Sequence, residues 1–138
     1  INGHTNSIED VLAEMVFKYE RDLADTGESF IIVGRCAEEV LKDRPGLIRV
    51  FITGDYDTKL THLVKDRGFT EREAADLMKK MDNKRRSYHN YHSSTKWGEA
   101  SGYDLVINSS ELGIDNSAEL ICKYVELWKN KDILEERD

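Results

Sequence analysis

The sequence predicts an α/β fold in which a small parallel sheet is covered by helices on both faces. Three short apolar runs rich in branched residues lack the alternation of a half-exposed strand, which indicates strands buried on both faces. Stretches with helical spacing separate these runs, and strands that alternate with helices are typical of a parallel sheet. The expected strands are 30–33, 47–52 and 105–107.

The length and composition of the chain restrict its class. A chain of 138 residues fits a single α/β domain over residues 1–138. Its net charge of −7 argues against a general affinity for nucleic acid or anionic membranes. No apolar run approaches the roughly 20 residues of a membrane span, and the N-terminus lacks the apolar region of a signal peptide. The two cysteines match no metal spacing, so reduced thiols in the cytoplasm are the simplest interpretation.

The first expected helix begins after Ser7 and ends at the 25–27 turn. Ser7 is a suitable N-cap, and Glu9 and Asp10 lie near the positive end of the helix dipole. Apolar residues at helical spacing predict one buried face. These residues are Ile8, Val11, Leu12, Met15, Tyr19 and Leu23.

Two helices flank the second expected strand. The first is short, over 36–42, and the second ends at Gly68. Asp55 or Asp57 can cap the second helix, and both possibilities remain open. Its residues expected to be buried are Leu60, Leu63 and Val64.

A longer helix is expected from Thr70 to about Tyr91. Thr70 and Glu73 form a capping box, because the glutamate stands three residues after the threonine. The apolar stripe of this helix comprises Ala74, Leu77, Met78 and Met81. The polar, glycine-containing stretch 92–103 predicts a mobile loop.

The last expected helix follows the third strand. Asp115 or Asn116 can cap this helix. The residues that it is expected to bury are Leu120, Ile121, Tyr124, Val125 and Trp128.

Arg35 stands where the first expected strand ends. Ligands of parallel sheets bind outside the carboxyl ends of the strands, and an arginine there is permanently charged. Gly34 leaves room for close approach to the backbone, and the amides that open the following helix favour an anion. Alternatively, Arg35 pairs with a surface carboxylate, Glu38 or Glu39.

The segment KKMDNKRRSYHNY, residues 79–91, is basic in a chain that is acidic elsewhere. Its cations are Lys79, Lys80, Lys84, Arg85 and Arg86. Local positive charge suits a multiply charged phosphate ligand, because a guanidinium group binds two oxygens at once. The alternative is a solvated helix end, where cations offset the negative pole of the helix dipole.

Histidine, cysteine and aromatic residues give weaker signals. His89 and His92 stand three apart, but no third metal ligand is evident, so an exposed pair is expected. Cys36 has no nearby histidine in the sequence and is expected to be structural. The aromatic residues near the cations either stack on a nucleobase or hold the loop against the body; they are Tyr88, Tyr91 and Trp97.

In their order and spacing, four segments resemble the cytidylate kinase-like family of P-loop phosphotransferases. They are FIIVGRCAEEVL, LIRVFI, DNKRRSYHNYHSSTKWG and YDLVINSSELGI, and the resemblance runs from about Glu9 to Trp128. It implies a three-layer, P-loop NTPase-like fold. It also implies transfer of the ATP γ-phosphate, with Mg²⁺, to a nucleoside monophosphate or a similar small acceptor.

The resemblance also implies roles for particular residues. Arg85 and Arg86 would contact the oxygens of the transferred phosphate, and the segment 79–103 would be a lid that excludes water. The implied acceptor-binding residues are Gly34, Arg35, Lys84 and Tyr88.

Two departures from the family pattern bear on these expectations. Cys36 stands where cytidylate kinases proper carry an aspartate, which leaves the acceptor open. The sequence contains no G-x-x-x-x-G-K-[ST] phosphate loop. In the family, this loop and the first strand of the sheet lie N-terminal to all the segments that are found here. We therefore expect the C-terminal portion of a longer protein. If the portion stands alone, a homodimer or a partner strand is expected to fill the gap in the sheet.

Two other functions are compatible with the sequence. The chain could be a non-catalytic nucleotide-binding or regulatory domain that kept the fold without the ATP loop. It could also be a nucleic-acid-binding module that uses the basic helix, but such modules are usually basic overall, and this chain carries a net charge of −7.

Overall fold

A computed structural model describes residues 7–131 and divides the chain into two compact units. The first unit comprises Ile1–Leu47 and Arg85–Trp97, and the second comprises Ile48–Lys84 and Gly98–Asp138. Within the described residues, no helix is both long and apolar enough to cross a bilayer.

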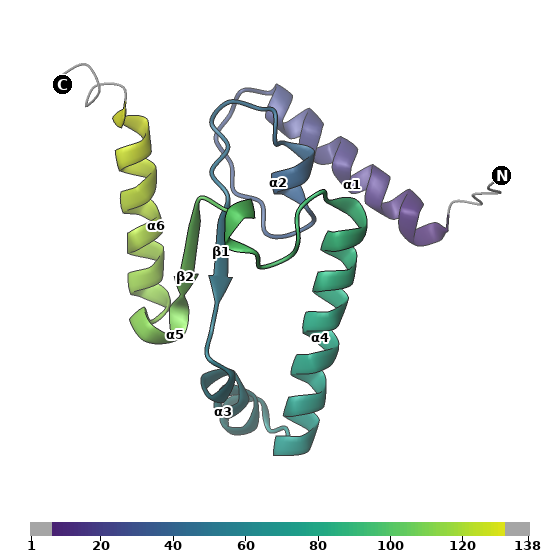
Figure 1. Cartoon of the computed structure of the whole chain (residues 1–138), viewed down its shortest axis with the longest axis vertical. Coiled ribbons are helices and arrows are strands. Elements are labelled where there is room, and N and C mark those ends of the chain that lie inside the picture. The colour runs from purple at the N-terminus through teal and green to yellow at the C-terminus, as the bar shows by residue number, and fades with distance from the viewer. Residues whose placement is uncertain (1–6, 132–138) are drawn as a thin grey trace. The chain divides into compact units, whose positions relative to one another are not determined.

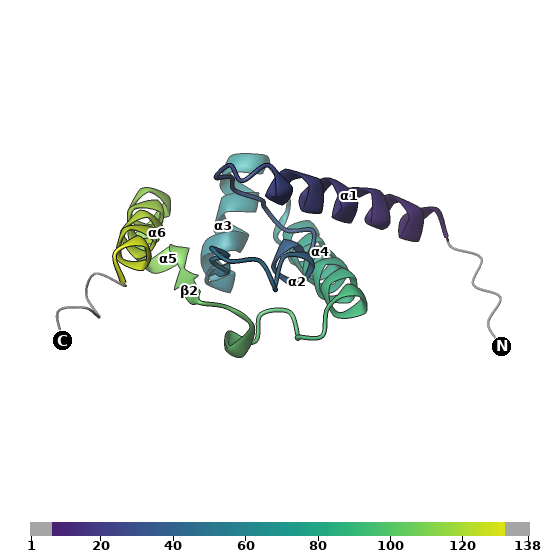
Figure 2. The same cartoon turned by 90° about the horizontal axis from the view of Figure 1, so that it is seen from above.

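The first unit is helical. It contains α1 (Ile8–Asp25), the short α2 (Ala37–Val40) and the last turns of α4 (Glu71–His92) (Figure 1). The predicted N-cap is confirmed, because the Asp10 amide donates to Ser7 Oγ at 3.1 Å. Figure 2 shows α2 near one end of α1 and beside the C-terminal end of α4. The core of the unit consists of Ala13, Phe17 and Cys36, with Val40 and Tyr88 packed against it.

The predicted buried face of α1 is wrong. Its buried residues are Ala13, Phe17 and Glu20, whereas the residues expected to be buried are mostly exposed. The exposed ones are Ile8, Val11, Leu12, Met15 and Tyr19. An apolar stripe is buried only where another surface covers it, and in the described part of the chain α2 and α4 contact the opposite face of α1.

Residues 30–33 form no strand, contrary to expectation. Ile31 and Val33 are 93% and 90% exposed. A strand persists when its backbone groups pair with a neighbour, and the sheet of the described residues pairs only β1 with β2. The next expected helix, 36–42, is reduced to the four residues of α2.

The second unit contains the parallel sheet that makes this an α/β fold. β1 (Val50–Thr53) pairs with β2 (Leu105–Asn108), with Val50 opposite Leu105 and Thr53 opposite Asn108. Both strands begin or end within a few residues of the predicted ranges. Within the described residues, however, the sheet has two strands instead of the expected three.

The helices around the sheet begin and end where local signals occur. After β1, Asp55 is the N-cap of α3 (Tyr56–Arg67), and Gly68 ends the helix in the left-handed region at φ 75°. The start of α4 confirms the predicted capping at Thr70, whose Oγ1 accepts from the Glu73 amide at 3.1 Å.

The end of the chain differs from the prediction. A short 3₁₀ turn, η1 (Ala100–Gly102), precedes β2, and the unpredicted α5 (Ser109–Leu112) leads into α6 (Ile114–Lys129) (Figure 1). Gly113, at φ 81°, is the N-cap of α6, so the predicted cap at Asp115 or Asn116 is wrong. Glycine reverses the chain there without a Cβ penalty, which lets the helix begin earlier.

Arg49 and Asp104 link the chain just before the two strands. The Arg49 amide donates to Asp104 Oδ2 at 2.8 Å, and its Nε and Nη2 donate to the same carboxylate at 3.2 and 3.1 Å. The Arg49 side-chain hydrogen bonds hold the pKa of Asp104 below its usual range.

We expect Asp104→Asn to lower the free energy of unfolding at pH 7 by about 1–2 kcal/mol. Because the folded-state pKa is depressed, this stabilisation is present above the unfolded-state pKa and is lost as the pH falls through the folded-state value. Urea melts at pH 7 and pH 3 measure the difference, and exposed Asp76→Asn is the control. A difference between wild type and Asp104→Asn that is equal at both pH values would contradict the ionic contribution.

Candidate functional site

The turn before α2 brings Arg35 to the surface. Gly34, Arg35 and Cys36 have φ angles of 73°, 58° and 53°, so three successive residues are left-handed. For the two non-glycine residues this conformation costs about 1–2 kcal/mol each. The turn is closed by the Ala37 amide, which donates to the Gly34 carbonyl at 3.3 Å. As a result Cys36 points into the core, while Arg35 is exposed.

Arg35 lies over Tyr88 of α4. Its guanidinium carbon is 5.8 Å from the centroid of the tyrosine ring, a cation–π distance. Burial raises the pKa of Tyr88, while the charge and hydrogen bond of Arg35 oppose that shift. Of the carboxylates proposed as alternative partners, Glu38 pairs with His89 and Glu39 with Lys42.

The basic segment presents its cations on two faces of α4. Lys84 and Arg85 precede Tyr88 by four and three residues, and therefore share its helix face. Arg86 lies elsewhere, with its guanidinium carbon 5.4 Å from the centroid of the Trp97 ring. The Trp97 amide donates to Asn90 Oδ1 at 2.9 Å, which favours the interpretation that this tryptophan holds the loop in place.

The predicted site residues thus divide into two groups. Arg35 lies over Tyr88, on the face of α4 that also carries Arg85. Arg86 lies on another face, over the ring of Trp97. The side chains of all three arginines are exposed. Exposed guanidinium groups on one helix face can bind the oxygens of one multiply charged anion. The helix amides expected to assist them contribute little, because α2 has only four residues.

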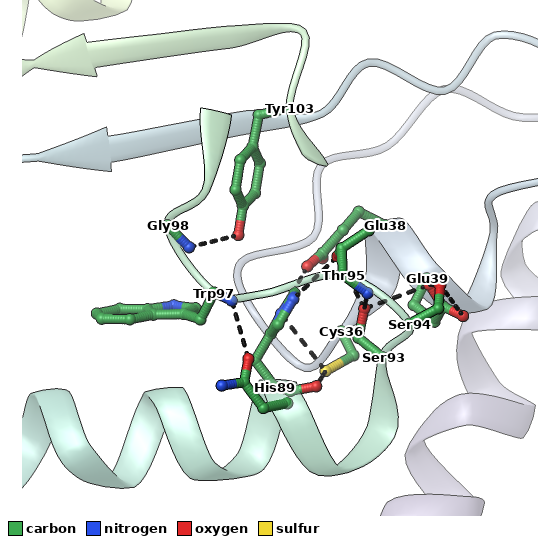
Figure 3. A network of polar contacts seen from close by, with 11 residues as sticks. Cys36, Glu38, Glu39, His89, Ser93, Ser94, Thr95, Trp97, Gly98 and Tyr103 are labelled. Atoms are coloured by element: carbon green, nitrogen blue, oxygen red, sulfur yellow. Dashed lines mark hydrogen bonds and ion pairs between the residues drawn. The ribbon is translucent and has the colours of Figure 1, made fainter. Parts of the chain in front are cut away.

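A buried polar network lies beneath the turn (Figure 3). His89 is 4% exposed, and its Nδ1 is 3.0 Å from Glu38 Oε1. Its Nε2 is 3.3 Å from the Thr95 hydroxyl, and the Cys36 thiol donates to the His89 carbonyl at 3.9 Å. The network ties α2 to the end of α4.

The loop after α4 is held by the same helix α2. The hydroxyls of Ser93 and Ser94 donate to Glu39 at 3.3 and 3.2 Å (Figure 3). Burial acts to raise the pKa of Glu39, but the hydrogen bond and charge of Lys42, together with these serine contacts, hold it below its usual range. The predicted mobility of the 92–103 stretch remains a prediction.

Two expectations about histidines are wrong. His89 is buried, and its Nδ1 lies 3.9 Å from the Cys36 sulfur, although the two residues are far apart in the sequence. His92 is half-buried in an aromatic group, with ring centroids 5.1 Å from Phe17 and 4.7 Å from Tyr88. Within the part of the chain that the structure describes, no group of three or more His, Cys, Asp or Glu side chains could hold a metal ion.

The Cys36–His89 pair is structural. Burial, followed by the neighbouring carboxylates, raises the pKa of the Cys36 thiol to about 12. The thiol therefore stays protonated at neutral pH, and a protonated thiol is a poor nucleophile. The expected structural role of Cys36 agrees with this environment.

Glu20 is the residue that the sequence analysis missed. It is 2% exposed, and neither of its carboxyl oxygens has a hydrogen-bond partner. Burial, followed by the charge of Glu38, raises its pKa to about 7, and Arg21 and Arg35 act in the opposite direction. Glu20 stands three residues after Phe17 and seven after Ala13, a spacing that places it on the same helix face. That spacing was the signal in the sequence for its burial.

An α/β protein with exposed arginines gathered at one turn and one helix is suited to an anionic ligand. A family model matches residues 1–111, and the chain belongs to the cytidylate kinase-like family. The chain is also similar to an uncharacterized protein from Eubacterium ventriosum ATCC 27560, known from its crystal structure. The two are 39% identical with a TM-score of 0.81, over 88% of this chain and 68% of that one. No curated protein matches this chain.

The family relates the chain to kinases and to nucleotide binding in general. Exposed arginines can bind phosphate oxygens through charge-assisted hydrogen bonds. The given sequence contains no glycine-rich phosphate loop of the G-x-x-x-x-G-K-[ST] type.

Proposed function

We propose that this chain binds a nucleoside monophosphate, or a similar small phosphorylated acceptor, and serves in transfer of the ATP γ-phosphate to it. The observation that carries the proposal is the position of Arg35 over Tyr88, on the helix face that also bears Arg85. Membership of the cytidylate kinase-like family supports the kinase-like chemistry.

In this proposal the residues act by position and charge. Arg35 binds the acceptor's phosphate, while Arg85 and Arg86 neutralise the oxygens of the transferred group. Tyr88 orients Arg35 through its ring. Phosphoryl transfer depends mostly on alignment and on neutralisation of oxygen charge, so arginines can do this work without a general base. A lid over 79–103 would exclude the water that competes with the acceptor.

The test combines binding with turnover. The full chain is titrated with AMP, CMP, UMP and GMP by calorimetry, and each mixture is then assayed for ADP formation with ATP and Mg²⁺. Binding accompanied by acceptor-dependent ADP formation is expected. Binding without ADP formation would instead support a nucleotide-binding domain without catalysis. Absence of binding to every nucleotide would contradict both.

Arg35→Ala is expected to weaken nucleotide binding by about 10- to 100-fold, because a charge-assisted contact to phosphate is lost. Calorimetry measures the change. The control is Arg67→Ala, which removes an exposed arginine from the last turn of α3 and should leave affinity unchanged. If the two variants bind alike, Arg35 has no part in the site.

A further inference from the structure

Three aromatic residues lie near the exposed arginines, and the structure distinguishes them. The ring of Trp97 faces the Arg86 guanidinium group at 5.4 Å, and its amide is bonded to Asn90, so this residue holds the loop after α4. Tyr88 is half-buried and packs against the core of the first unit. Tyr91, in contrast, is 72% exposed. Of the three rings, that of Tyr91 is therefore the one that a ligand can reach.

Tyr91 lies close to the arginine of the candidate site. Tyr88 and Tyr91 stand three residues apart on α4, and residues at that spacing are neighbours on a helix surface, with Cβ atoms roughly 5–6 Å apart. The guanidinium carbon of Arg35 lies 5.8 Å from the centroid of the Tyr88 ring. The exposed guanidinium group and the exposed phenol ring are thus both neighbours of Tyr88, within the first unit.

A contact with His92 supports the ring of Tyr91. The two ring centroids are 4.7 Å apart, and the ring planes are inclined at 85°. In such an arrangement the edge of one ring meets the face of the other, so this contact leaves at least one face of the phenol ring open. His92 is itself held by Phe17 and Tyr88, at centroid distances of 5.1 and 4.7 Å. A supported ring loses less conformational entropy when a ligand covers it.

An open aromatic face near a guanidinium group matches the two ends of a nucleotide. The guanidinium group can bind phosphate oxygens, and the aromatic ring can stack on the flat face of a nucleobase. In a nucleotide the ribose separates the base from the phosphate, so the two ends contact neighbouring side chains and not the same one. Arg35 and Tyr91 are placed in this way, with the ring of Tyr88 as their common neighbour.

We propose that Tyr91 stacks on the base of the acceptor while Arg35 binds its phosphate, so that the acceptor is a nucleoside monophosphate and not a phosphorylated compound without a base. This inference rests on the proposed function, because it takes Arg35 as the residue that binds the phosphate. Stacking uses the π-face that every base has, and not the donors and acceptors at its edge. Tyr91 therefore contributes to the binding of every nucleoside monophosphate and does not select among the bases.

AMP and ribose 5-phosphate are the probes, because they share the phosphate and the ribose and differ in the base. Calorimetry measures the dissociation constant of each for the full chain. AMP is expected to bind about 5- to 100-fold more tightly, which is the range for stacking of one base on an aromatic side chain. The NMR resonances of the adenine H2 and H8 protons should move upfield on binding, because the ring current of a stacked tyrosine shields them.

Two variants of Tyr91 separate stacking from simple bulk. Tyr91→Leu keeps an apolar side chain without a π-face, so it should lose the preference for AMP and the upfield shift, while its constant for ribose 5-phosphate is unchanged. Tyr91→Phe keeps the ring and should retain the preference. The control is Tyr56→Leu, which changes a 56% exposed tyrosine at the start of α3 and should leave both constants unchanged. Thermal melts show whether each variant is folded.

The outcomes distinguish the inference from the function on which it rests. If AMP and ribose 5-phosphate bind equally well to the wild type, or if Tyr91→Leu weakens both by the same factor, the inference fails and the proposed function stands. If Tyr91→Leu keeps the full preference for AMP, another residue binds the base, and the inference fails in the same way. If neither probe nor any other nucleoside monophosphate binds, the proposed function fails, and the inference with it.

Discussion

Replacing Arg85 and Arg86 together by alanine is expected to weaken nucleotide binding by about 100-fold or more, with little effect on stability. Each guanidinium group can make charge-assisted contacts to phosphate oxygens, worth about 1.5–3 kcal/mol apiece. Both side chains are exposed in the structure, and Arg86 lies over Trp97. Exposed ion pairs and cation–π contacts contribute at most about 1 kcal/mol each, so the free energy of unfolding should fall only slightly.

The control for this experiment is the replacement of Lys79 and Lys80 by alanine. It removes the same net charge from exposed positions of the same helix, six residues earlier. Calorimetric titration measures the nucleotide affinity of both double variants, and urea melts measure their free energy of unfolding. Equal losses of affinity would mean that overall charge matters and not the placement of the arginines. A loss of several kcal/mol in stability would mean that Arg85 and Arg86 are structural.

Replacing His89 by alanine is expected to lower the free energy of unfolding by about 3 kcal/mol. The change leaves Glu38 half-buried and without its partner, and removes the contact to the Thr95 hydroxyl. Leaving a buried polar group without its partner costs about 1–3 kcal/mol, and the loss of two contacts at once places this case at the upper end. In a chain of this length the midpoint of thermal unfolding should fall by roughly 6–12 °C.

His62→Ala provides the matched comparison for His89. His62 also pairs with a carboxylate, Asp66, at 2.7 Å, but both side chains are exposed on α3. Exposed pairs of this kind contribute about 0.3–0.5 kcal/mol. Calorimetric melts at pH 7 measure both variants. A loss below 1 kcal/mol in His89→Ala would show that the network beneath the Arg35 turn does not hold α2 to α4.

Much of the local structure could be predicted from the sequence, because helix ends depend on neighbouring residues. Ser7 and Thr70 cap helices as expected, and Gly68 ends α3 in the left-handed conformation that glycine favours. The parallel pair of strands follows from two unalternating apolar runs. The errors arise where structure depends on a distant partner, as for residues 30–33, which have no strand beside them in the described residues.

The candidate site was predictable only in part. Arg35, Tyr88 and Arg85 were singled out by residue type and by resemblance, and the structure places them at one turn and one helix face. Their roles in binding and transfer remain predictions, as do the homodimer and the cytoplasmic location. Glu20 and the Glu38–His89 pair escaped notice, because a charged residue on a helix is normally assumed to face water.

The sequence by itself determined the α/β class, the positions of the longer helices, and the family. These depend on residue order, on local caps and on periodicity, all of which are contained in short stretches of chain. Only the tertiary structure decided which face of α1 is buried, that His89 meets Cys36, and that Glu20 is buried without a hydrogen-bond partner. Burial and pKa depend on groups that approach from remote parts of the chain, and no local pattern encodes that approach.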